Sequence, residues 1–457
     1  MFICLNIALF ETIDLSIDPF IDPFIDSFAM SPAATSQAAR PSLKPLDQAL
    51  AELLACAAPL AGFDEVASFD ADGRVLAQDV ISSLDVPAHD NSAMDGYALC
   101  SADWRDAQTS LSVNQRIAAG SSGQALGPAC AARIFTGAPI PPGADAVVMQ
   151  EDCMLSNPAD PAKPANAATT PPTLRVQVQP QSGQWIRRRG EDVASGSVVL
   201  KRGQRLTPAS LGLAASIGFD KLRVAKPVRV ALFSTGDELV MPGDVLPADM
   251  KPGAIYNSNR FFLRALLLRL GCTVTDLGIV PDKLDATVAA LRGASQKHDL
   301  ILTSGGVSVG EEDHIKPAVQ SLGQLNLWQI AIKPGKPFAY GTVGSAHFIG
   351  LPGNPVSSFV TFLLLVRPFI LTLQGSNSVA PDSIAARADF AWAKADKRRE
   401  FLRVKRNAAG GLDLFNNQSS GVLTSAVWGD GLVDNPAGHT IAPGDTVRYL
   451  PFTSLIS

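Results

Sequence analysis

Three turn-rich runs lie close together in the chain: TSGGVSVGEED (Thr303–Asp313), KPGKP (Lys333–Pro337) and GLPGNP (Gly350–Pro355). The first and the last follow apolar segments that have the length and composition of buried strands. Glycine-rich turns of this kind expose backbone N–H groups, and these runs add lysines and a group of carboxylates. The combination favours the binding of a phosphorylated anion with a hard metal ion nearby.

The sequence around these runs alternates between apolar strands and helices. The segment 228–235 predicts a buried strand, and the segments 259–270 and 284–294 predict helices. A strand at 300–303 leads into the first glycine turn, and a long helix is predicted from Pro355 to about residue 373. This alternation is typical of a three-layer α/β domain with a mostly parallel sheet, whose ligands lie beyond the carboxyl ends of the strands.

The composition changes on both sides of this segment, and we expect a multidomain protein of the α/β plus β class. Helices predicted at 45–61 and 208–217 are expected to pack together in a linking domain that a second domain interrupts. Short strand-like runs among many glycines and prolines predict this inserted domain, and alternating strands near the end predict a β-barrel-like domain. The predicted boundaries are 1–43 for a disordered extension, 44–84 with 186–226 for the discontinuous linking domain, 85–185 for the Gly/Pro-rich domain, 227–376 for the α/β domain and 377–457 for the C-terminal β domain.

Charge and cysteine usage exclude some classes of protein. The chain has 457 residues, 38 of them basic and 43 acidic, so a general nucleic-acid binder with a basic surface is not expected. The six cysteines are scattered without a CxxC pair, which favours free thiols in a reducing compartment, and we expect a cytoplasmic protein. The longest apolar run, near 359–373, is interrupted by Arg367 and Pro368, so we expect no membrane partner.

The first residues lack the features of a secretory signal peptide, because no basic segment precedes the apolar stretch Met1–Leu9. Met30 begins a lead-in rich in serine, alanine and proline, and we hypothesise that translation starts there. The intact mass of the natively expressed protein tests this hypothesis, and a mass that includes Met1 would contradict it.

Acidic residues follow several predicted strands. Glu238, Asp282 and Asp313 come from three separate strand ends, and a helix is expected to begin near Glu312. Since Mg²⁺ prefers one or two carboxylates together with ligand oxygens and waters, these three side chains are candidate metal ligands. Any one of them could instead cap a helix or lie at the surface, which is the commoner role of an acid.

The two later runs predict a second anion site. Lys333 and Lys336 lie on a proline-stiffened turn, where an anion would relieve their mutual repulsion. Pro355 is a favourable first residue for the following helix, whose N-terminus would add backbone donors beside Ser357. The alternative for the lysines is an ordinary solvated loop.

The run GVSVG also matches the G-x-S-x-G pattern of α/β-hydrolases, with Ser308 as the nucleophile. That pattern needs its serine directly after the strand, whereas Ser304 and two glycines intervene here. His314 is too close in sequence to serve as the triad histidine, so we discount a hydrolase.

Seven motifs occur together and in order. They are DNSAMDGYA, FTGAPIPPGADAVVMQED, IRRRGEDV, FSTGDEL, SGGVSVGEED, KPGKPFAYG and GLPGNPVS. From about Pro45 onward the chain resembles the MoeA family of molybdopterin molybdenumtransferases, which are related to the E domain of gephyrin. The resemblance implies Mg²⁺-dependent insertion of molybdate into adenylylated molybdopterin, with release of AMP. It also implies an elongated homodimer, in which the α/β domain of one subunit binds molybdopterin and faces the Gly/Pro-rich domain of the other. Contact with other enzymes of the pathway is implied as well.

The resemblance assigns roles to residues at the matching positions. Asp313, Asp282 and Glu238 would be catalytic acids and metal ligands. Gly305, Gly306 and Ser308 would line the pterin-phosphate pocket. A substrate-binding set that includes an oxyanion pocket for molybdate would comprise Lys333, Lys336, Pro352, Pro355, Ser357, Arg403 and Ser420. Asp90, Thr136, Arg187 and Asp192 would face the cleft from the partner subunit.

Two other functions remain open at this point. A molybdopterin adenylyltransferase resembles only the segment 228–374 and lacks the other domains. A non-catalytic scaffold or carrier of the gephyrin type has no need of the acid group, KPGKP and GLPGNP together. The enzyme is therefore the favoured interpretation.

Overall fold

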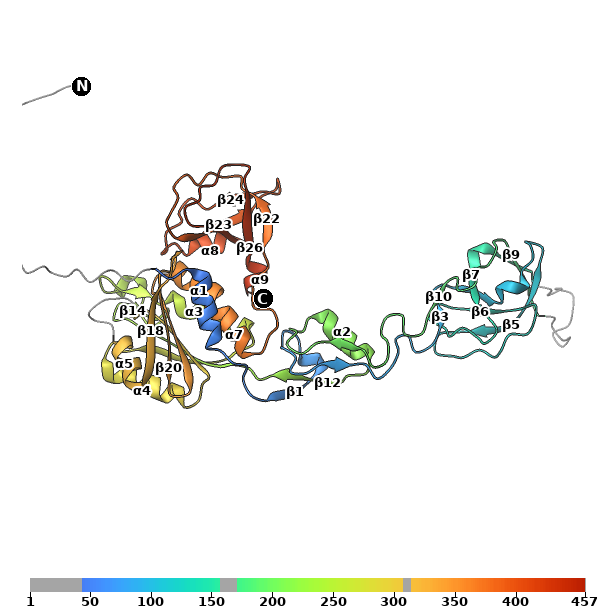
Figure 1. Ribbon diagram of the computed structural model, residues 1–457, viewed down its shortest axis with the longest axis horizontal. Coiled ribbons are helices and arrows are strands. Elements are labelled where there is room, and N and C mark those ends of the chain that lie inside the picture. Colours follow the sequence, from blue (N-terminus) through green and yellow to red (C-terminus); the bar gives the residue numbers. More distant parts are fainter. Residues whose placement is uncertain (1–42, 157–170, 307–313, 457) are drawn as a thin grey trace, which may run out of the picture. The chain divides into compact units, whose positions relative to one another are not determined.

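The computed structural model describes residues 43–156, 171–306 and 314–456, and its helices and strands are shown in Figure 1. The α/β region is built on a six-stranded sheet with the strand order β16-β13-β17-β21-β20-β18. The first four strands pair in parallel, whereas β20 pairs antiparallel with both β21 and β18. The parallel half carries the strand ends after which the two glycine-rich turns, at Gly305 and Gly353, lie. The strands are β13 (Arg229–Thr235), β16 (Thr273–Val280), β17 (Leu300–Ser304), β18 (Gly323–Gln329), β20 (Pro337–Val343) and β21 (Ala346–Leu351).

Helices cover both faces of this sheet, as the sequence predicts. Side chains alternate along β13, so Val230 and Leu232 enter one core while Ala231 and Phe233 enter the other. The first core is closed by α1, α3, α6 and α7, and the second by α4 and α5. The bounds of these helices are α1 (Leu46–Ala55), α3 (Ser258–Arg269), α4 (Leu284–Ser295), α5 (Ile315–Leu322), α6 (Pro355–Thr361) and α7 (Arg367–Leu373).

The helix predicted from Pro355 to about residue 373 is confirmed. A π-helical turn at Phe362–Val366 joins α6 to α7, so the helical segment is continuous over 19 residues. It is long and apolar enough to span a membrane, but 94% of its 18-residue apolar window is buried inside the protein. We therefore identify it as a core helix.

The expected partnership of the first and second helices is wrong. Leu46, Ala49 and Leu53 of α1 lie in the core of the α/β region, and α1 lies against α7 (Figure 1). The linking region instead buries α2 (Pro208–Ser216) among two small sheets. Helical periodicity identifies the apolar face of a helix, but it does not identify the surface that buries this face. The two sheets pair β1 (Phe63–Ala67) with β12 (Lys221–Ala225) and β2 (Val80–Ile81) with β11 (Val198–Leu200).

The Gly/Pro-rich region forms a six-stranded sheet in the order β7-β4-β6-β5-β9-β8, together with the short antiparallel pair β3 and β10. Most of its buried side chains are alanine, valine and leucine. The strands are β3 (Asn91–Ser92), β4 (Gly96–Leu99), β5 (Ser110–Ile117), β6 (Cys130–Ile134), β7 (Ala146–Met149), β8 (Cys153–Ser156), β9 (Thr173–Val176) and β10 (Ile186–Arg187).

The C-terminal region is rich in strands, as predicted, and its sheet has the order β19-β23-β25-β26-β22, with β24 paired to β23. The edge strand β19 comes from the KPGKP segment, where Ile332 pairs with Arg399 and Lys333 with Glu400. The α/β region therefore contributes a strand to the C-terminal sheet. The elements are β19 (Ile332–Lys333), β22 (Ile384–Arg387), β23 (Arg399–Arg406), β24 (Leu412–Leu414), β25 (Gly431–Asn435), β26 (Thr446–Pro451), α8 (Thr424–Trp428) and α9 (Phe452–Ile456).

The cysteines that the structure describes are all free thiols, which confirms that part of the cysteine prediction. The domain boundaries proposed from the sequence stay a prediction.

Candidate active site

A cavity of about 560 Å³ lies beyond the carboxyl ends of β13, β17 and β21. It is bordered by the short parallel pair β14 (Leu239–Val240) and β15 (Ile255–Tyr256) and by the start of α3. Its position is the one that the sheet topology predicts for a ligand site. The predicted residues that line it are Glu238, Asp282, Gly305, Gly306, Pro352, Pro355 and Ser357.

The two glycine turns lie against each other at the floor of this cavity. Gly305 has φ +96°, and its N–H donates to the Leu351 carbonyl oxygen at 3.1 Å. A Cβ atom at Gly305 would lie 2.9 Å from the Thr235 carbonyl oxygen, so no other residue fits this position without a backbone shift. A Cβ atom at Gly353 would lie 3.9 Å from the Gly305 Cα. Bare backbone from three strand ends therefore forms one surface.

Replacing Gly305 with alanine should both strain this turn and narrow the cavity. We expect a loss of about 1–3 kcal/mol in the free energy of unfolding, because a positive φ and a backbone collision are both imposed. Urea unfolding measures this loss, and Gly421→Ala, where a Cβ atom meets nothing within 4 Å, is the control. Unchanged stability of Gly305→Ala would contradict the close approach.

Two carboxylates face the cavity from different strand ends. Glu238 folds back over Gly236, where a Cβ atom would come within 2.6 Å of the Glu238 carboxylate. Asp282 follows β16 and lines the same cavity. Among the described residues no three acidic, histidine or cysteine side chains form a metal-binding group. Two carboxylates nevertheless meet the requirement of Mg²⁺, which takes its remaining ligands from substrate and water.

Sequence reasoning missed two asparagines at the start of α3. Asn259 is 7% exposed, and its Nδ2 donates to Ser304 Oγ and to the Gly353 carbonyl oxygen, both at 2.7 Å. Asn257 is 2% exposed, and its side chain accepts from the Arg260 N–H at 3.3 Å. Within the described part of the chain, Asn259 Oδ1 and Asn257 Nδ2 have no hydrogen-bond partner. In the sequence the only signal is an asparagine before a helix, which normally indicates a cap.

The N-terminus of α6 is already engaged by the C-terminal region. The Val356 N–H donates to the Ser420 carbonyl oxygen at 2.9 Å, so this donor is not available to an anion as the sequence suggests. The contact places the backbone of Ser420 beside Ser357, which lines the cavity. Lys333, Lys336, Arg403 and Ser420 do not line the cavity themselves.

Arg403 is a buried cation, 1% exposed, and its hydrogen-bond partners among the described residues are neutral groups. Its guanidinium donates to Ser425 Oγ at 3.1 Å and to the carbonyl oxygens of Phe401 at 3.0 Å and Ser419 at 3.3 Å. It forms no ion pair with any carboxylate that the structure describes. Burial lowers its pKa to about 10, so it stays charged at neutral pH and attracts an anion.

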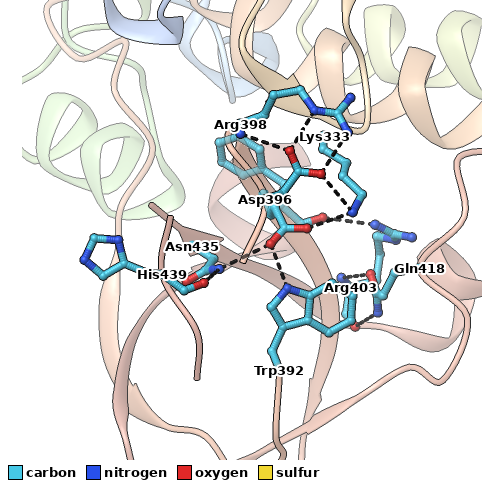
Figure 2. Close-up of polar contacts among 10 residues, drawn as sticks. Lys333, Trp392, Asp396, Arg398, Arg403, Gln418, Asn435 and His439 are labelled. Atoms are coloured by element: carbon cyan, nitrogen blue, oxygen red, sulfur yellow. Dashed lines mark hydrogen bonds and ion pairs between the residues drawn. The ribbon is translucent and has the colours of Figure 1, made fainter. Parts of the chain in front are cut away.

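Lys333, in contrast, is held by two carboxylates (Figure 2). Its Nζ lies 3.0 Å from Glu400 Oε1 and 3.3 Å from Asp396 Oδ2. The Lys336 side chain is exposed and has no hydrogen bond or ion pair within residues 43–156, 171–306 and 314–456. The two lysines of KPGKP, which the sequence treats alike, thus have different surroundings.

Comparison with known proteins identifies the family. The MoeA N-terminal region (domain I and II) matches residues 44–218, a "probable molybdopterin binding domain" matches 231–372, and the MoeA C-terminal region (domain IV) matches 385–452. A molybdopterin molybdenumtransferase of Haemophilus influenzae is 41% identical over 395 residues, which are 85% of this chain and 93% of the relative. The chain belongs to the MoeA family.

Other MoeA relatives agree in sequence and in fold. Molybdopterin molybdenumtransferase 2 of Mycobacterium tuberculosis is 34% identical over 86% of this chain and 95% of its own length. Two crystal structures of the molybdopterin biosynthesis MoeA protein of Pyrococcus horikoshii cover 90% of this chain, at TM-scores of 0.70 and 0.75. They are 29% and 25% identical, and the match covers 99% and 100% of those chains. The MoeA arrangement of mixed sheets and helices is therefore the fold of this chain.

The residues expected to face a partner subunit lie in the MoeA N-terminal region, and none of them lines the cavity. Asp90 accepts from the Arg189 N–H at 2.8 Å and from Arg188 Nη1 at 2.7 Å, and these bonds, the backbone one first, lower its pKa. Thr136 donates through its N–H and its hydroxyl to Asp95, at 2.7 and 2.8 Å. The other two, Arg187 on β10 and Asp192, are exposed.

Two predicted residues of the MoeA glycine turn, Ser308 and Asp313, lie outside the described residues, as does the expected helix start near Glu312. The described helix α5 begins at Ile315.

Proposed function

We propose that this chain inserts molybdate into adenylylated molybdopterin in a Mg²⁺-dependent reaction that releases AMP. The chain is a transferase of molybdenum cofactor biosynthesis, as its MoeA domains and its molybdenumtransferase relatives establish. The observation that carries the finer proposal is the cavity, which combines bare glycine backbone with two carboxylates. Such a site suits a phosphate-bearing pterin and a divalent cation.

In this proposal the described residues divide the work of binding. The turns at Gly305 and Pro352 cradle the pterin phosphate, because close approach of bare backbone favours an anion. Glu238 and Asp282, with Asp313, would hold Mg²⁺, which when bound supplies positive charge beside the departing phosphate. The asparagines at the start of α3 fix the positions of the turns.

The second substrate is the molybdate dianion. Arg403 and Lys336 would supply its positive surroundings, with the hydroxyls of Ser357 and Ser420 as further donors. The Val356–Ser420 contact supports this grouping, since it joins the cavity to the loop that accepts from Arg403. No nucleophilic side chain is needed, because the pterin dithiolene sulfurs take up molybdenum.

We also propose the wider setting that the resemblance implies. The protein would act as a cytoplasmic homodimer and meet other enzymes of its pathway. Asp90, Thr136, Arg187 and Asp192 would complete the site from the partner subunit. None of the four lines the cavity of its own chain, which supports a role toward the partner subunit.

The release of AMP from adenylylated molybdopterin tests the proposal. We expect release that requires both molybdate and Mg²⁺, and removal of Mg²⁺ with a chelator should stop it. Sulfate in place of molybdate is the control, because it offers the same charge without a metal to transfer. Tight binding of the pterin without any molybdate-dependent release would contradict the proposal and favour a carrier.

A further inference from the structure

We propose that Lys333 is a positioning residue rather than a ligand of the oxyanion, and that Glu400 is the anchor through which it acts. The inference rests on the proposed function, since it divides the two lysines of KPGKP between different roles. In this division Lys333 clamps the turn to the C-terminal sheet, and Lys336 is the lysine that meets the oxyanion.

The contacts of Lys333 are those of a structural ion pair. Its ammonium lies between Glu400 and Asp396, at 3.0 and 3.3 Å, and Asp396 is also bound by Arg398 at 2.9 Å (Figure 2). The negative charges of Glu400 and Asp396 therefore balance the positive charges of Lys333 and Arg398. An incoming dianion would meet two negative charges next to the Lys333 ammonium, which opposes its binding there.

Glu400 is the buried member of the pair, since its side chain is only 1% exposed. Its Oε2 accepts from Trp392 Nε1 at 2.7 Å and from Asn435 Nδ2 at 3.4 Å, while Lys333 binds Oε1 (Figure 2). Trp392 and Asn435 donate hydrogen bonds but carry no charge. If Lys333 left to bind a substrate, Glu400 would remain as a buried anion with neutral partners, which is strongly unfavourable.

The sheet register separates Lys333 from Arg403. Lys333 pairs with Glu400 in the β19–β23 ladder, so their side chains share one face of the sheet. Residues 400 and 403 are an odd number apart on β23, so Arg403 projects from the opposite face, together with Phe401. Ile332 and Phe401 indeed lie in the α/β core, whereas Leu402 lies in the C-terminal core. The two cations therefore do not converge on one anion.

The other end of the turn is fixed by packing. Pro334 and Gly335 are buried, and a Cβ atom at Gly335 would collide with Thr361 Oγ1 of α6. The turn is thus held between α6 and the Lys333–Glu400 pair, and this arrangement sets the place from which Lys336 extends into solvent. Loss of the pair would release one end of the turn.

The test is molybdate binding measured by equilibrium dialysis on the full chain and on four variants: K333Q, E400Q, the double variant K333Q/E400Q, and K336Q. K333Q leaves Glu400 buried without its cation, so we expect about 10-fold weaker binding through displacement of the turn. In the double variant the two amides can hydrogen-bond and no buried charge remains, so binding should return to within about 3-fold of wild type. K336Q should weaken binding about 10-fold with an unchanged melting temperature.

The double variant decides between the two roles even if K333Q alone fails to fold. Binding by K333Q/E400Q as weak as that of K336Q would show that the Lys333 amine itself is a ligand, and would overturn the inference. Wild-type affinity in K333Q would overturn it as well. Failure of the wild-type protein to bind molybdate would refute the proposed oxyanion pocket and the inference with it. This outcome can be told apart from the two outcomes above, in which the wild-type protein binds molybdate. Asp389→Asn, which removes one exposed carboxylate of the same domain, is the charge control.

Discussion

Replacing Arg403 with methionine is expected to weaken molybdate binding strongly while the protein remains folded. Arg403 is the buried cation of the proposed oxyanion pocket, and it has no carboxylate partner in the described part of the chain. Truncating a buried, hydrogen-bonded charge at a binding site costs about 2–5 kcal/mol, so affinity should fall by roughly 30-fold to several thousand-fold. Equilibrium dialysis with molybdate measures this loss.

The stability of the same variant should fall only modestly. The guanidinium donates to two carbonyl oxygens and one hydroxyl, and its removal takes one donor from each of them, although the Ser419 carbonyl oxygen keeps the Val422 N–H at 3.4 Å. Each unmade bond costs about 1–3 kcal/mol, but removal of an uncompensated buried charge offsets part of this loss. Lys405 lies on the exposed end of the same strand, β23, and Lys405→Met removes an equal charge. This control variant should change neither the affinity for molybdate nor the stability of the protein. Full retention of molybdate binding by Arg403→Met would place the oxyanion elsewhere.

Replacing Asp282 with asparagine is expected to reduce molybdate-dependent AMP release by about 100-fold or more, the usual effect of removing one group that stabilises charge in the transition state. The change keeps the size of the side chain and removes the charge that would hold Mg²⁺. Glu238 faces the cavity from a different strand end, and the same reasoning applies to Glu238→Gln. Steady-state rates over a range of Mg²⁺ concentrations measure the effect, and both variants should need more Mg²⁺ than wild type.

A matched control lies three residues further along the chain. Asp285 is exposed in the first turn of α4 and does not line the cavity, so Asp285→Asn should retain wild-type rates. Molybdate affinity should be unchanged in all three variants, because the residues proposed to bind molybdate do not include these acids. Loss of molybdate affinity with a normal rate at saturation would contradict the metal-binding role and assign Asp282 to the oxyanion instead.

Local patterns predicted the positions of the α/β elements well. Strands β13 and β17, helices α3 and α4 and the helix that starts at Pro355 all lie within a residue or two of their predicted bounds, because apolar periodicity and proline are local signals. The same signals identified the cavity, since parallel strands bring their carboxyl ends to one edge.

One error is local, since the helix predicted at 45–61 ends at Ala55, and the others concern contacts between residues that are distant in sequence. The apolar face of α1 was predicted, but the surface that covers it belongs to α7. The capping of Val356 by Ser420 and the pairing of Lys333 with Glu400 each join segments more than sixty residues apart. Asn259 was missed for a related reason, because its hydrogen bonds to Ser304 and Gly353 appear only after the strands are assembled.

Strand β19 has a consequence for protein engineering. The chain leaves the α/β sheet after β18, contributes Ile332 and Lys333 to the edge of the C-terminal sheet, and returns to the α/β sheet at β20. A chimera that exchanges only residues after 377 would join a foreign β23 to the native β19 and would have to match its register and its buried glutamate. The transferable unit is therefore non-contiguous, and a graft of the C-terminal region should include the KPGKP segment of the same donor.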